Sequence, residues 1–394
     1  MSDSGGDASF DHDELPFGSF TSLEMRGVPR VGVAVGAQVL DLTAAAAVLV
    51  PRHSELFERG SLDPLLASGA AVWAEVRAAL QSADLSAHRT FPISDVQMLL
   101  PFTVADYVDF YASEHHATRA GQILRPGSQA LAPNWRTMPV GYHGRAGTVV
   151  VSGTPIRRPT GQLPPVADAP PEVGPTRRLD FEAEVGYVVG AASTPGHPVS
   201  VDAFADHVFG VCLLNDWSAR DIQGWESRPL GPFLGKSFAT SISPWIVPLA
   251  ALQSSRRPVP SAASALPYLQ ESSPWGLDLM LEVRVDGQLI GRLPYTAMHW
   301  SPAQMLAHLT SNGTPLRTGD LYGSGTVSGP GDDECGCLLE ASRNGERPLD
   351  LPDGTSLAWL EDGMEVVISG TAAGPDGTRL TLGEVSGRIL PASG

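Results

Sequence analysis

One short stretch of the sequence gathers residue types that enzymes use for proton transfer and metal binding. The stretch "DFYASEHHA" contains Asp109, Tyr111, Glu114, His115 and His116. Imidazole, with an unperturbed pKa of about 6.5, can take a proton from water near neutral pH, and carboxylates can bind a divalent cation. A polar surface loop is the alternative interpretation, and the stretch by itself leaves both open.

A second group of carboxylates lies on a predicted strand. In "RLDFEAEVGYVVG", apolar residues alternate with Asp180, Glu182 and Glu184, so a strand would place the three carboxylates on one face. Like charges at i and i+2 lie about 7 Å apart and repel each other unless water or a cation separates them. The pattern therefore allows either a solvated strand face or an oxygen-ligand site for Mg²⁺, Ca²⁺ or Mn²⁺.

The apolar run "GVCLL" predicts another strand, buried on both faces, which ends near Asp216. A short helical turn after this strand would place Arg220 and Gln223, three residues apart, side by side. Ligands commonly bind where strands end at a cleft, so these side chains are candidates for a binding site. In the alternative interpretation, Asp216 caps the turn and Arg220 pairs with Asp221 or Glu226.

Three further polar residues lie in or beside glycine-containing segments. Lys236, in "GPFLGKSFAT", fails the phosphate-loop pattern because three residues rather than four separate the glycines. We expect Lys236 to be a partly buried cation that neutralises carboxylates or an oxyanion. Thr326, in "GSGTVSGP", has a backbone that can approach a ligand closely. Glu340 ends the run "CGCLLE" and, from a buried strand, could orient a histidine, although capping or a surface ion pair is the more common role.

The elements that must position these residues are predicted to be mostly strands. The 42 glycines and 34 prolines divide the 394 residues into short segments, as β-rich folds require. Helices are predicted over 69–81 and after Ser301, which can form a capping box with Gln304. Hairpins are predicted at three glycine-containing turns, namely Gly36, Asp286-Gly287 and Asn344-Gly345.

The chain is expected to divide into three parts. Residues 1–18 are predicted to be a flexible acidic tail, residues 19–100 a small β domain, and residues 101–394 a larger β-rich domain with few helices. A chain of 394 residues buries roughly three quarters of its unfolded surface, so more than one domain can fold without disulfides.

Composition excludes several classes of partner. The sequence has 43 acidic and 26 basic residues, a net charge of −17 and a pI near 4.9, so neither nucleic acid nor an anionic membrane is an expected partner. Its first residues lack the basic and apolar regions of a signal peptide, and no apolar run approaches the ~18 residues that span a bilayer. A cytoplasmic location is therefore expected. Cys212, Cys335 and Cys337 match neither a disulfide framework nor a zinc knuckle, and we expect reduced structural thiols.

Five segments resemble the fumarylacetoacetate hydrolase family, in order and with matching spacing: "DYVDFYASEHHATRAGQILRP", "NWRTMPVGYHGRAGTVVVSGTPIRRPTGQ", "LDFEAEVGYVVG", "LLNDWSARDIQGWESRPLGPFLGKSFATSISPWIVP" and "GSGTVSGP". The resemblance covers nearly the whole chain. It implies an SH3-like N-terminal barrel at 19–100, a larger mixed β-sandwich roll at 101–394, and a homodimer. It also implies metal-dependent hydrolysis of the carbon–carbon bond of 4-fumarylacetoacetate to fumarate and acetoacetate, the last step of tyrosine and phenylalanine breakdown.

The resemblance implies a role for each residue that matches a family position. The implied ligands of a Mg²⁺ or Ca²⁺ ion are Asp109, Glu182, Glu184 and Asp216. The implied base is His116, oriented by Glu340, and the groups around the oxyanion are Arg220, Gln223 and Lys236. The implied substrate contacts are Tyr111, Arg125, Tyr142, Gln223 and Thr326. Lys236 and Thr240 also lie where the family places a second, structural Mg²⁺ near Asp216. The resemblance thus favours a metal site over a solvated face for the carboxylate strand.

Some residues depart from the family pattern or match none of its functional positions. Ser227 stands in place of a tyrosine that contacts substrate, and Ala239 replaces a common glycine. Asp180, Glu114 and His115 match no functional position. Two alternatives to fumarylacetoacetate hydrolysis therefore remain: an enzyme for another β-diketo or acylpyruvate acid, and a non-catalytic Ca²⁺-binding β protein.

Overall fold

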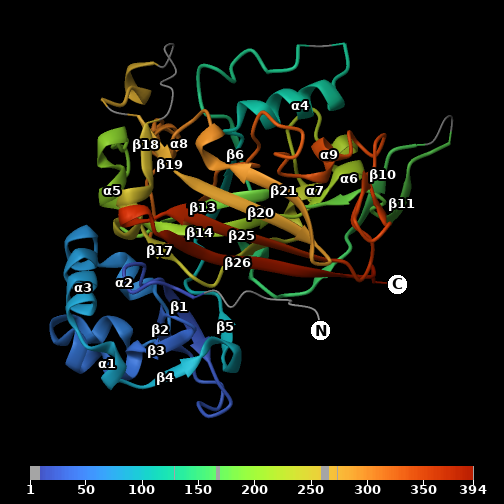
Figure 1. Ribbon diagram of the computed structural model, residues 1–394. Coiled ribbons are helices and arrows are strands. Elements are labelled where there is room, and N and C mark those ends of the chain that lie inside the picture. The colour runs from blue at the N-terminus through green and yellow to red at the C-terminus, as the bar shows by residue number, and fades with distance from the viewer. Residues whose placement is uncertain (1–8, 128, 166–168, 259–265, 273, 394) are drawn as a thin grey trace.

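The computed structural model describes residues 9–127, 129–165, 169–258, 266–272 and 274–393. The protein is mainly β with few helices, as predicted (Figure 1). A smaller N-terminal part, drawn in blue, packs against a larger part built on two curled sheets. Within the described ranges, no helix combines the length and the apolar composition that crossing a bilayer requires.

The N-terminal part is a five-stranded antiparallel sheet in the order β4-β3-β2-β1-β5 with three helices beside it. Its strands are β1 (Phe17–Thr21), β2 (Arg30–Val35), β3 (Gln38–Asp41), β4 (Thr90–Pro92) and β5 (Gln97–Leu99), and its helices are α1 (Leu42–Leu49), α2 (Asp63–Ala67) and α3 (Ala70–Ser82). The predicted hairpin is confirmed: Gly36, at φ +60°, lies in the turn between β2 and β3. Helix α3 confirms the helix predicted over 69–81, one residue further along the chain.

The predicted flexible tail of residues 1–18 extends too far along the chain, because packed structure begins at Phe10. Phe10, Leu15 and Phe17 are buried, and Phe17 begins β1. The N–H of Phe10 donates to the carbonyl of Gly36, and its ring packs edge-on against Trp245 at 5.6 Å. Five of residues 1–18 are acidic, but a few apolar side chains fix the described part of the segment against the rest of the protein. Residues 1–8 of the predicted tail lie outside the described ranges.

The larger part contains an eight-stranded mixed sheet in the order β7-β6-β22-β13-β14-β16-β8, with β17 also paired to β14. Its strands are β6 (Asp106–Phe110), β7 (Gly141–His143), β8 (Val149–Val151), β13 (Ala183–Val189), β14 (Val208–Asp216), β16 (Thr240–Ile242), β17 (Val247–Pro248) and β22 (Asp320–Gly323). The pairs β22–β6 and β16–β8 are parallel and the others are antiparallel.

A five-stranded sheet in the order β21-β20-β25-β26-β9 packs on one face of the eight-stranded sheet. Its strands are β9 (Ile156–Arg157), β20 (Leu279–Val285), β21 (Gln288–Pro294), β25 (Glu365–Ala373) and β26 (Arg379–Leu390). Asp286 and Gly287, at φ +47° and +79°, form the turn between β20 and β21, which confirms the predicted hairpin.

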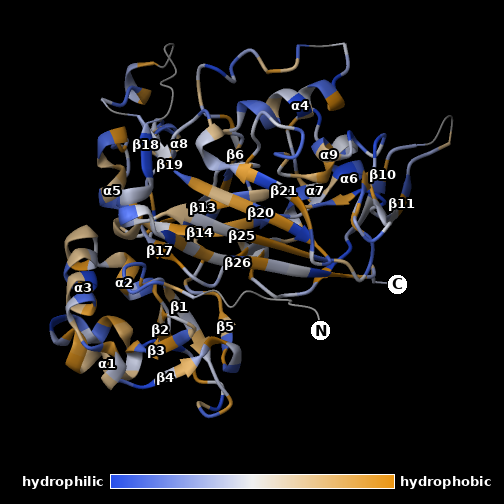
Figure 2. Ribbon diagram, viewed as in Figure 1, coloured by the Kyte–Doolittle hydropathy of each residue, from blue (hydrophilic) through white to orange (hydrophobic). Residues whose placement is uncertain are grey.

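Strand β14 is buried on both faces, as its continuous apolar run predicts. Val211 and Leu213 belong to the core between the two sheets, whereas Cys212 and Leu214 face the core shared with the N-terminal part. The central strands are accordingly rich in hydrophobic residues (Figure 2).

The other helices of the larger part are α4 (Glu114–Leu124), α5 (Phe204–His207), α6 (Arg220–Glu226), α7 (Leu234–Ser237), α8 (Pro302–Thr310) and α9 (Leu338–Ala341). Two-stranded pairs complete it: β10 (Thr160–Leu163) with β11 (Glu172–Pro175), β12 (Leu179–Asp180) with β15 (Ser218–Ala219), β18 (Arg256–Pro258) with β19 (Trp275–Leu277), and β23 (Leu349–Asp350) with β24 (Ser356–Leu357). The capping box of Ser301 and Gln304 begins α8, as predicted. Helices α4, α6, α7 and α9 gather near one end of the sheets (Figure 1).

Two predictions for the segment around Glu340 are wrong. Glu340 lies in the short helix α9 rather than at the end of a strand. Asn344 and Gly345, at φ +61° and +83°, reverse the chain just after this helix instead of closing a hairpin. Residues that tolerate a left-handed backbone serve both purposes, so the dipeptide alone does not distinguish a helix end from a hairpin.

Candidate active site

Four carboxylates converge at the ends of neighbouring strands in the eight-stranded sheet. Asp109 lies near the end of β6, Asp216 ends β14, Glu184 lies in β13, and Glu182 directly precedes β13. One ligand oxygen from each lies within 4.8 Å of the others. All four are at most 5% exposed, so the solvated-face interpretation is wrong for Glu182 and Glu184.

Asp180 does not join this group, because the predicted strand is interrupted. Strand β12 ends at Asp180 and pairs with β15, whereas β13 begins at Ala183 and pairs with β14 and β22. The break directs the Asp180 carboxylate away from the other two and towards α9, where it accepts hydrogen bonds from the N–H groups of Leu338 and Leu339.

A glycine makes room for the four carboxylates. Strand β22 lies between β6 and β13, and its Gly323 is directly opposite Asp109. A Cβ atom at position 323 would lie 2.6 Å from Glu184 Oε2 and 2.8 Å from Asp109 Oδ1. These distances are shorter than van der Waals contact, so the carboxylates can meet above β22 only because residue 323 has no side chain.

The electrostatics of these carboxylates favour a bound cation. Burial, together with repulsion from neighbouring carboxylates, raises the pKa of Asp109, Glu184 and Asp216. Burial acts on Glu182 in the same direction, but the charges of Lys236, Arg220 and His116 outweigh it and hold its pKa below the ordinary value.

The ligand atoms themselves fit a hard divalent ion. Asp109 Oδ1, Glu184 Oε1 and Asp216 Oδ1 are buried, and among the described residues they have no hydrogen-bond partner. Carboxylate oxygens are the ligands that Mg²⁺ and Ca²⁺ prefer, and a divalent charge would offset the repulsion between the carboxylates. The residues present therefore fit a divalent metal site.

Lys236 is the only lysine in the sequence, and α7 places it inside this group of carboxylates. Its side chain is 4% exposed, and Nζ lies 2.5 Å from Glu182 Oε2 and 2.6 Å from Asp216 Oδ2. The prediction of a cation that neutralises a carboxylate cluster is confirmed. Thr240 is also buried, and on β16 it lies directly opposite Asp216.

Replacing Lys236 by methionine is expected to lower the free energy of unfolding by about 3–5 kcal/mol, because buried Asp216 loses its cation and buried Glu182 keeps only Arg220. Urea denaturation of the metal-free protein measures the effect. Arg52→Met, which removes an 80% exposed partner of Glu75, is the control and should change stability little. Equal effects of the two substitutions would contradict the expected role of Lys236.

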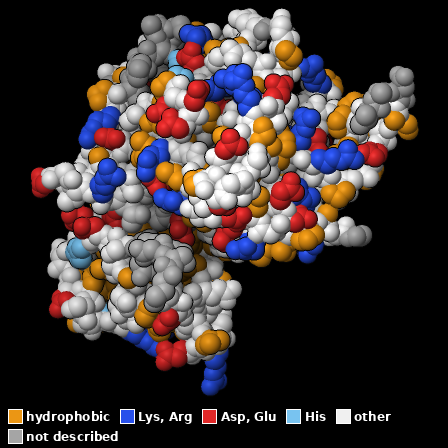
Figure 3. Space-filling view, turned by 45° about the vertical axis from the view of Figure 1, so that its right-hand side comes forward, with side chains coloured by type: hydrophobic (Ala, Val, Ile, Leu, Met, Phe, Trp, Pro, Cys, Tyr) orange, Lys and Arg blue, Asp and Glu red, His pale blue; other side chains and the backbone are white. Residues whose placement is uncertain are grey.

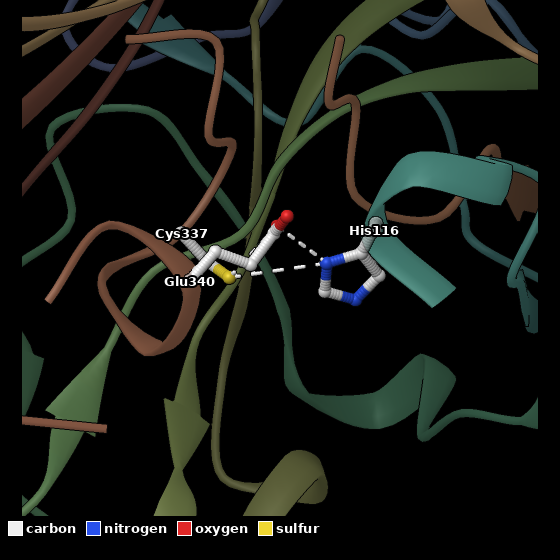
Figure 4. A group of neighbouring side chains, drawn as sticks. All are labelled: His116, Cys337 and Glu340. Carbon is white, nitrogen blue, oxygen red and sulfur yellow. Dashed lines mark hydrogen bonds and ion pairs between the residues drawn. The ribbon is translucent and has the colours of Figure 1, made fainter. Parts of the chain in front are cut away.

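His116 and Glu340 form a buried pair (Figure 4), and His116 also faces Glu182 of the carboxylate group. Ser113 caps α4 by accepting the N–H of His116 at 3.2 Å, which places the imidazole on the first turn of the helix. His116 Nδ1 lies 2.6 Å from Glu340 Oε1, whereas Nε2 faces Glu182 Oε1 at 3.9 Å. One ring nitrogen thus contacts an orienting carboxylate and the other faces the metal-binding group.

The surroundings of Glu340 keep it ionised. Its Oε1 accepts a hydrogen bond from Ser328 at 2.8 Å, and its Oε2 lies 3.4 Å from Arg119 Nη1. Burial would raise the pKa of Glu340, but His116, Ser328 and Arg119 outweigh burial and lower it. A charged Glu340 stabilises a proton on His116 and fixes the ring so that Nε2 is available.

Arg220 and Gln223 lie side by side on α6, as predicted, with Arg220 Nη1 donating to Gln223 Oε1 at 3.2 Å. Arg220 pairs with neither Asp221 nor Glu226. Its Nε donates to Asp180 Oδ2 at 2.8 Å, and its Nη1 lies 2.8 Å from Glu182 Oε1. Because Asp180 also binds the backbone of α9, one carboxylate holds both the Arg220 side chain and the helix that carries Glu340.

Asp180→Asn is expected to lower kcat by about 10- to 100-fold, since an amide cannot accept at both oxygen positions and must turn a donor towards Arg220 or α9. Initial rates and denaturation together measure the effect. Asp41→Asn is the control, because Asp41 is equally buried but caps α1 in the N-terminal part. Loss of stability without loss of kcat in both variants would show that Asp180 has only a structural role.

Four of the five predicted substrate contacts, the exception being Gln223, differ in the partners that surround them. The ring of Tyr111 packs edge-on against His116 at 5.1 Å, and the hydroxyl of Tyr142 lies 2.8 Å from Asp216 Oδ2 and 3.2 Å from Asp109 Oδ2. Thr326 Oγ1 is buried and, within the described chain, has no hydrogen-bond partner. Arg125 directly follows α4, and its guanidinium donates to the carbonyl of Ala130.

Reasoning from the sequence missed several residues that build the site. Asp180, Arg119 and Ser328 act through hydrogen bonds or ion pairs to partners distant in sequence, and Gly323 acts through the register between strands. Lys236, by contrast, was predicted, and the sequence marks it as the one lysine among 26 lysine and arginine residues.

The fold and the site define a mainly β protein in which a histidine–glutamate pair faces a buried four-carboxylate metal site, an arrangement suited to metal-assisted hydrolysis. Two family models match the chain, "Fumarylacetoacetase N-terminal" over residues 13–101 and "Fumarylacetoacetate (FAA) hydrolase C-terminal" over residues 106–386. The protein therefore belongs to the fumarylacetoacetate hydrolase family.

Individual relatives resemble the chain over nearly its full length. It is 43% identical to the fumarylacetoacetase of Bos taurus, covering 98% of this chain and 97% of that protein. It is 42% identical to that of Arabidopsis thaliana, covering 99% and 98% respectively. Among solved structures, the fumarylacetoacetate hydrolase of Exiguobacterium antarcticum has a TM-score of 0.58 at 18% identity and covers 96% of this chain and 99% of that one, which shows a shared fold.

Proposed function

We propose that this site hydrolyses the carbon–carbon bond of 4-fumarylacetoacetate to fumarate and acetoacetate, the last step of tyrosine and phenylalanine breakdown. The observation that carries the proposal is the position of His116 between Glu340 and the four carboxylates. Relatives named fumarylacetoacetase, 42–43% identical over nearly the whole chain, support this substrate. The protein is accordingly a hydrolase that acts on carbon–carbon bonds in ketonic substances.

His116 is the general base of the proposed reaction. Its Nδ1–H donates to Glu340 Oε1, so Nε2 carries the free lone pair and takes a proton from water. The water oxygen adds to the carbonyl carbon on the fumaryl side. Collapse of the adduct breaks the bond to the neighbouring carbon, whose electrons form the enolate of acetoacetate. The proton held by His116 is then available to that carbon.

The metal ligands in this proposal are Asp109, Glu182, Glu184 and Asp216, and the ion is Mg²⁺ or Ca²⁺. When bound, the ion supplies Lewis-acid stabilisation of negative charge on the diketone oxygens. Tyr142, whose hydroxyl lies beside two of these carboxylates, would help to orient them and contact the substrate. A second, structural Mg²⁺ near Asp216 would involve Lys236 and Thr240, which is supported by the position of Thr240 opposite Asp216.

Polar groups around the reacting carbonyl stabilise the oxyanion. Arg220 Nη2 is buried and has no hydrogen-bond partner among the described residues, so it is free to donate to a substrate oxygen. Each preorganised donor of this kind contributes on the order of 10² to 10³ in turnover. Gln223 and Lys236 are assigned to the same oxyanion, and Tyr111, Arg125 and Thr326 to the rest of the substrate.

Another acylpyruvate or β-diketo acid is the second candidate substrate, because Ser227 replaces the family tyrosine. Ser227 follows α6 and so lies close in the chain to Gln223. Comparing kcat/KM for fumarylacetoacetate and for acylpyruvates, followed as loss of substrate absorbance, tests the proposal. A clear preference for acylpyruvates would contradict it.

We also propose a homodimer, a cytoplasmic location and an SH3-like N-terminal unit. Leu230, Phe233 and Leu234, between 52% and 97% exposed, form an apolar segment near α7 that supports a protein interface. The antiparallel five-stranded sheet supports the SH3-like unit. On the face in Figure 3, acidic and basic side chains are interspersed, which fits a small-molecule substrate rather than nucleic acid. Light scattering of the purified protein tests the dimer.

A further inference from the structure

A cysteine completes a group of three potential metal ligands around the His116–Glu340 pair (Figure 4). Cys337 Sγ lies 3.4 Å from Glu340 Oε1 and 4.0 Å from His116 Nδ1. All three side chains are at most 4% exposed. The proposed reaction uses His116 and Glu340 but has no role for Cys337, and the group differs from the carboxylate site because it offers nitrogen, sulfur and oxygen together.

The thiol is not activated for chemistry of its own. Burial and the nearby charges of Glu340 and Asp180 raise the pKa of Cys337 well above its ordinary value, against the opposing charge of Arg220. A protonated, buried thiol is a poor nucleophile. A thiophilic divalent cation can nevertheless displace the thiol proton, since metal binding to cysteine is coupled to its deprotonation.

One of the three distances within this group matches tetrahedral zinc coordination, and the other two differ from it by less than about 1 Å. Zinc bonds of about 2.0–2.1 Å to nitrogen, 2.0–2.2 Å to oxygen and 2.3 Å to sulfur place the ligand atoms of a tetrahedral site about 3.3–3.6 Å apart. Cys337 and Glu340 already lie at such a distance, at 3.4 Å. His116 Nδ1 and Glu340 Oε1, now at 2.6 Å, would have to separate by less than about 1 Å, and Sγ would have to approach Nδ1 slightly.

We propose that His116, Cys337 and Glu340 form an inhibitory site for Zn²⁺ and related thiophilic divalent ions. Sulfur and imidazole ligands select zinc over Mg²⁺ or Ca²⁺, which prefer oxygen alone, so the two kinds of ion occupy different sites. Ser328 Oγ, 2.8 Å from Glu340 Oε1, or a water molecule would complete the coordination.

Zinc binding at this site removes the base. The ion takes the Nδ1 lone pair of His116, so the single proton of the neutral ring moves to Nε2, and the thiol proton of Cys337 passes to solvent as the zinc–nitrogen and zinc–sulfur bonds form. A metal-bound imidazole keeps the N–H on its other nitrogen, so Nε2 has no free lone pair with which to take a proton from water. The hydrogen bond from Nδ1 to Glu340, which orients the ring, is lost at the same time.

The first test is zinc inhibition of the Mg²⁺-saturated enzyme. Cys337→Ser should leave basal activity nearly unchanged and raise the Zn²⁺ concentration for half inhibition by at least about tenfold, in line with the cost of losing one ligand. Cys335→Ser is the matched control: its thiol lies two residues away and donates to the carbonyl of Asp332 instead. Equal zinc sensitivity of the parent and Cys337→Ser, or resistance of the parent to zinc, would overturn the proposal.

The second test measures binding without turnover. Co²⁺ added to the Mg²⁺-saturated parent should give a thiolate-to-cobalt charge-transfer band that Zn²⁺ removes, and Cys337→Ala should lack the band while Cys335→Ser keeps it. This part of the inference stands apart from the proposed function, because the band does not depend on which substrate the enzyme hydrolyses. A band of equal intensity in Cys337→Ala, or no band in the parent, would overturn the site.

Discussion

The His116→Ala variant is expected to lose about 10² to 10⁴ in kcat, the usual contribution of a general base. The reason is geometric: His116 is the only imidazole among the described residues that the structure places between the metal-binding group and an orienting carboxylate. Initial rates of fumarylacetoacetate hydrolysis measure the loss, with the metal ion at saturation so that base and metal effects are separated.

The neighbouring histidine provides a matched control. His115 lies one residue away on α4 but lines a separate surface pocket with Thr118 and Met298, so His115→Ala should retain most of the activity. Glu340→Gln should also lose activity, because it breaks the His116–Glu340 pair. The double variant with His116→Ala should therefore lose little more activity than His116→Ala alone. Full activity of His116→Ala, or fully additive losses, would contradict the assignment.

The Glu184→Gln variant is expected to bind Mg²⁺ or Ca²⁺ about 10- to 100-fold more weakly and to lose activity in parallel. Glu184 Oε1 is buried and, within the described chain, has no hydrogen-bond partner, whereas Oε2 accepts the N–H of Gly325 at 3.1 Å. The substitution therefore removes a ligand and a charge while leaving one amide oxygen for the backbone contact. Calorimetric titration with each ion measures the affinity.

Two further measurements separate metal binding from folding. Without metal, Glu184→Gln should be at least as stable as the parent, because one of several mutually repelling buried charges is removed. Gly323→Ala should also weaken metal binding, since its Cβ would displace the carboxylates of Asp109 and Glu184. Unchanged ion affinity in both variants would show that the ligands lie elsewhere.

The sequence predicts those features that depend on local pattern. The hairpins at Gly36 and Asp286-Gly287, helix α3, the capping box of α8 and the buried strand β14 follow from spacing and turn chemistry, and the structure confirms them. The pairing of Arg220 with Gln223 follows from helical periodicity in the same way.

Features that depend on tertiary packing could not be predicted locally. The break between β12 and β13 separates Asp180 from Glu182, although alternation in the sequence continues across it. Asn344-Gly345 reverses the chain just after α9, which packs against α4, and nothing in the dipeptide records that contact. The space that the four carboxylates occupy depends on the order of the strands. That order places Gly323 of β22 beside residues of β6 and β13 that are more than a hundred positions away in the chain.

Loss of fumarylacetoacetate absorbance can be followed with purified protein before and after treatment with a chelator, and again after addition of Mg²⁺ or Ca²⁺. The structure predicts rapid hydrolysis to fumarate and acetoacetate, loss of turnover on chelation, and recovery with either ion. The reason is that the four buried carboxylates form a site for a divalent ion, and that ion stabilises the negative charge of the reaction. Hydrolysis that is unaffected by complete removal of divalent ions, or no hydrolysis by the metal-saturated protein, would contradict this account.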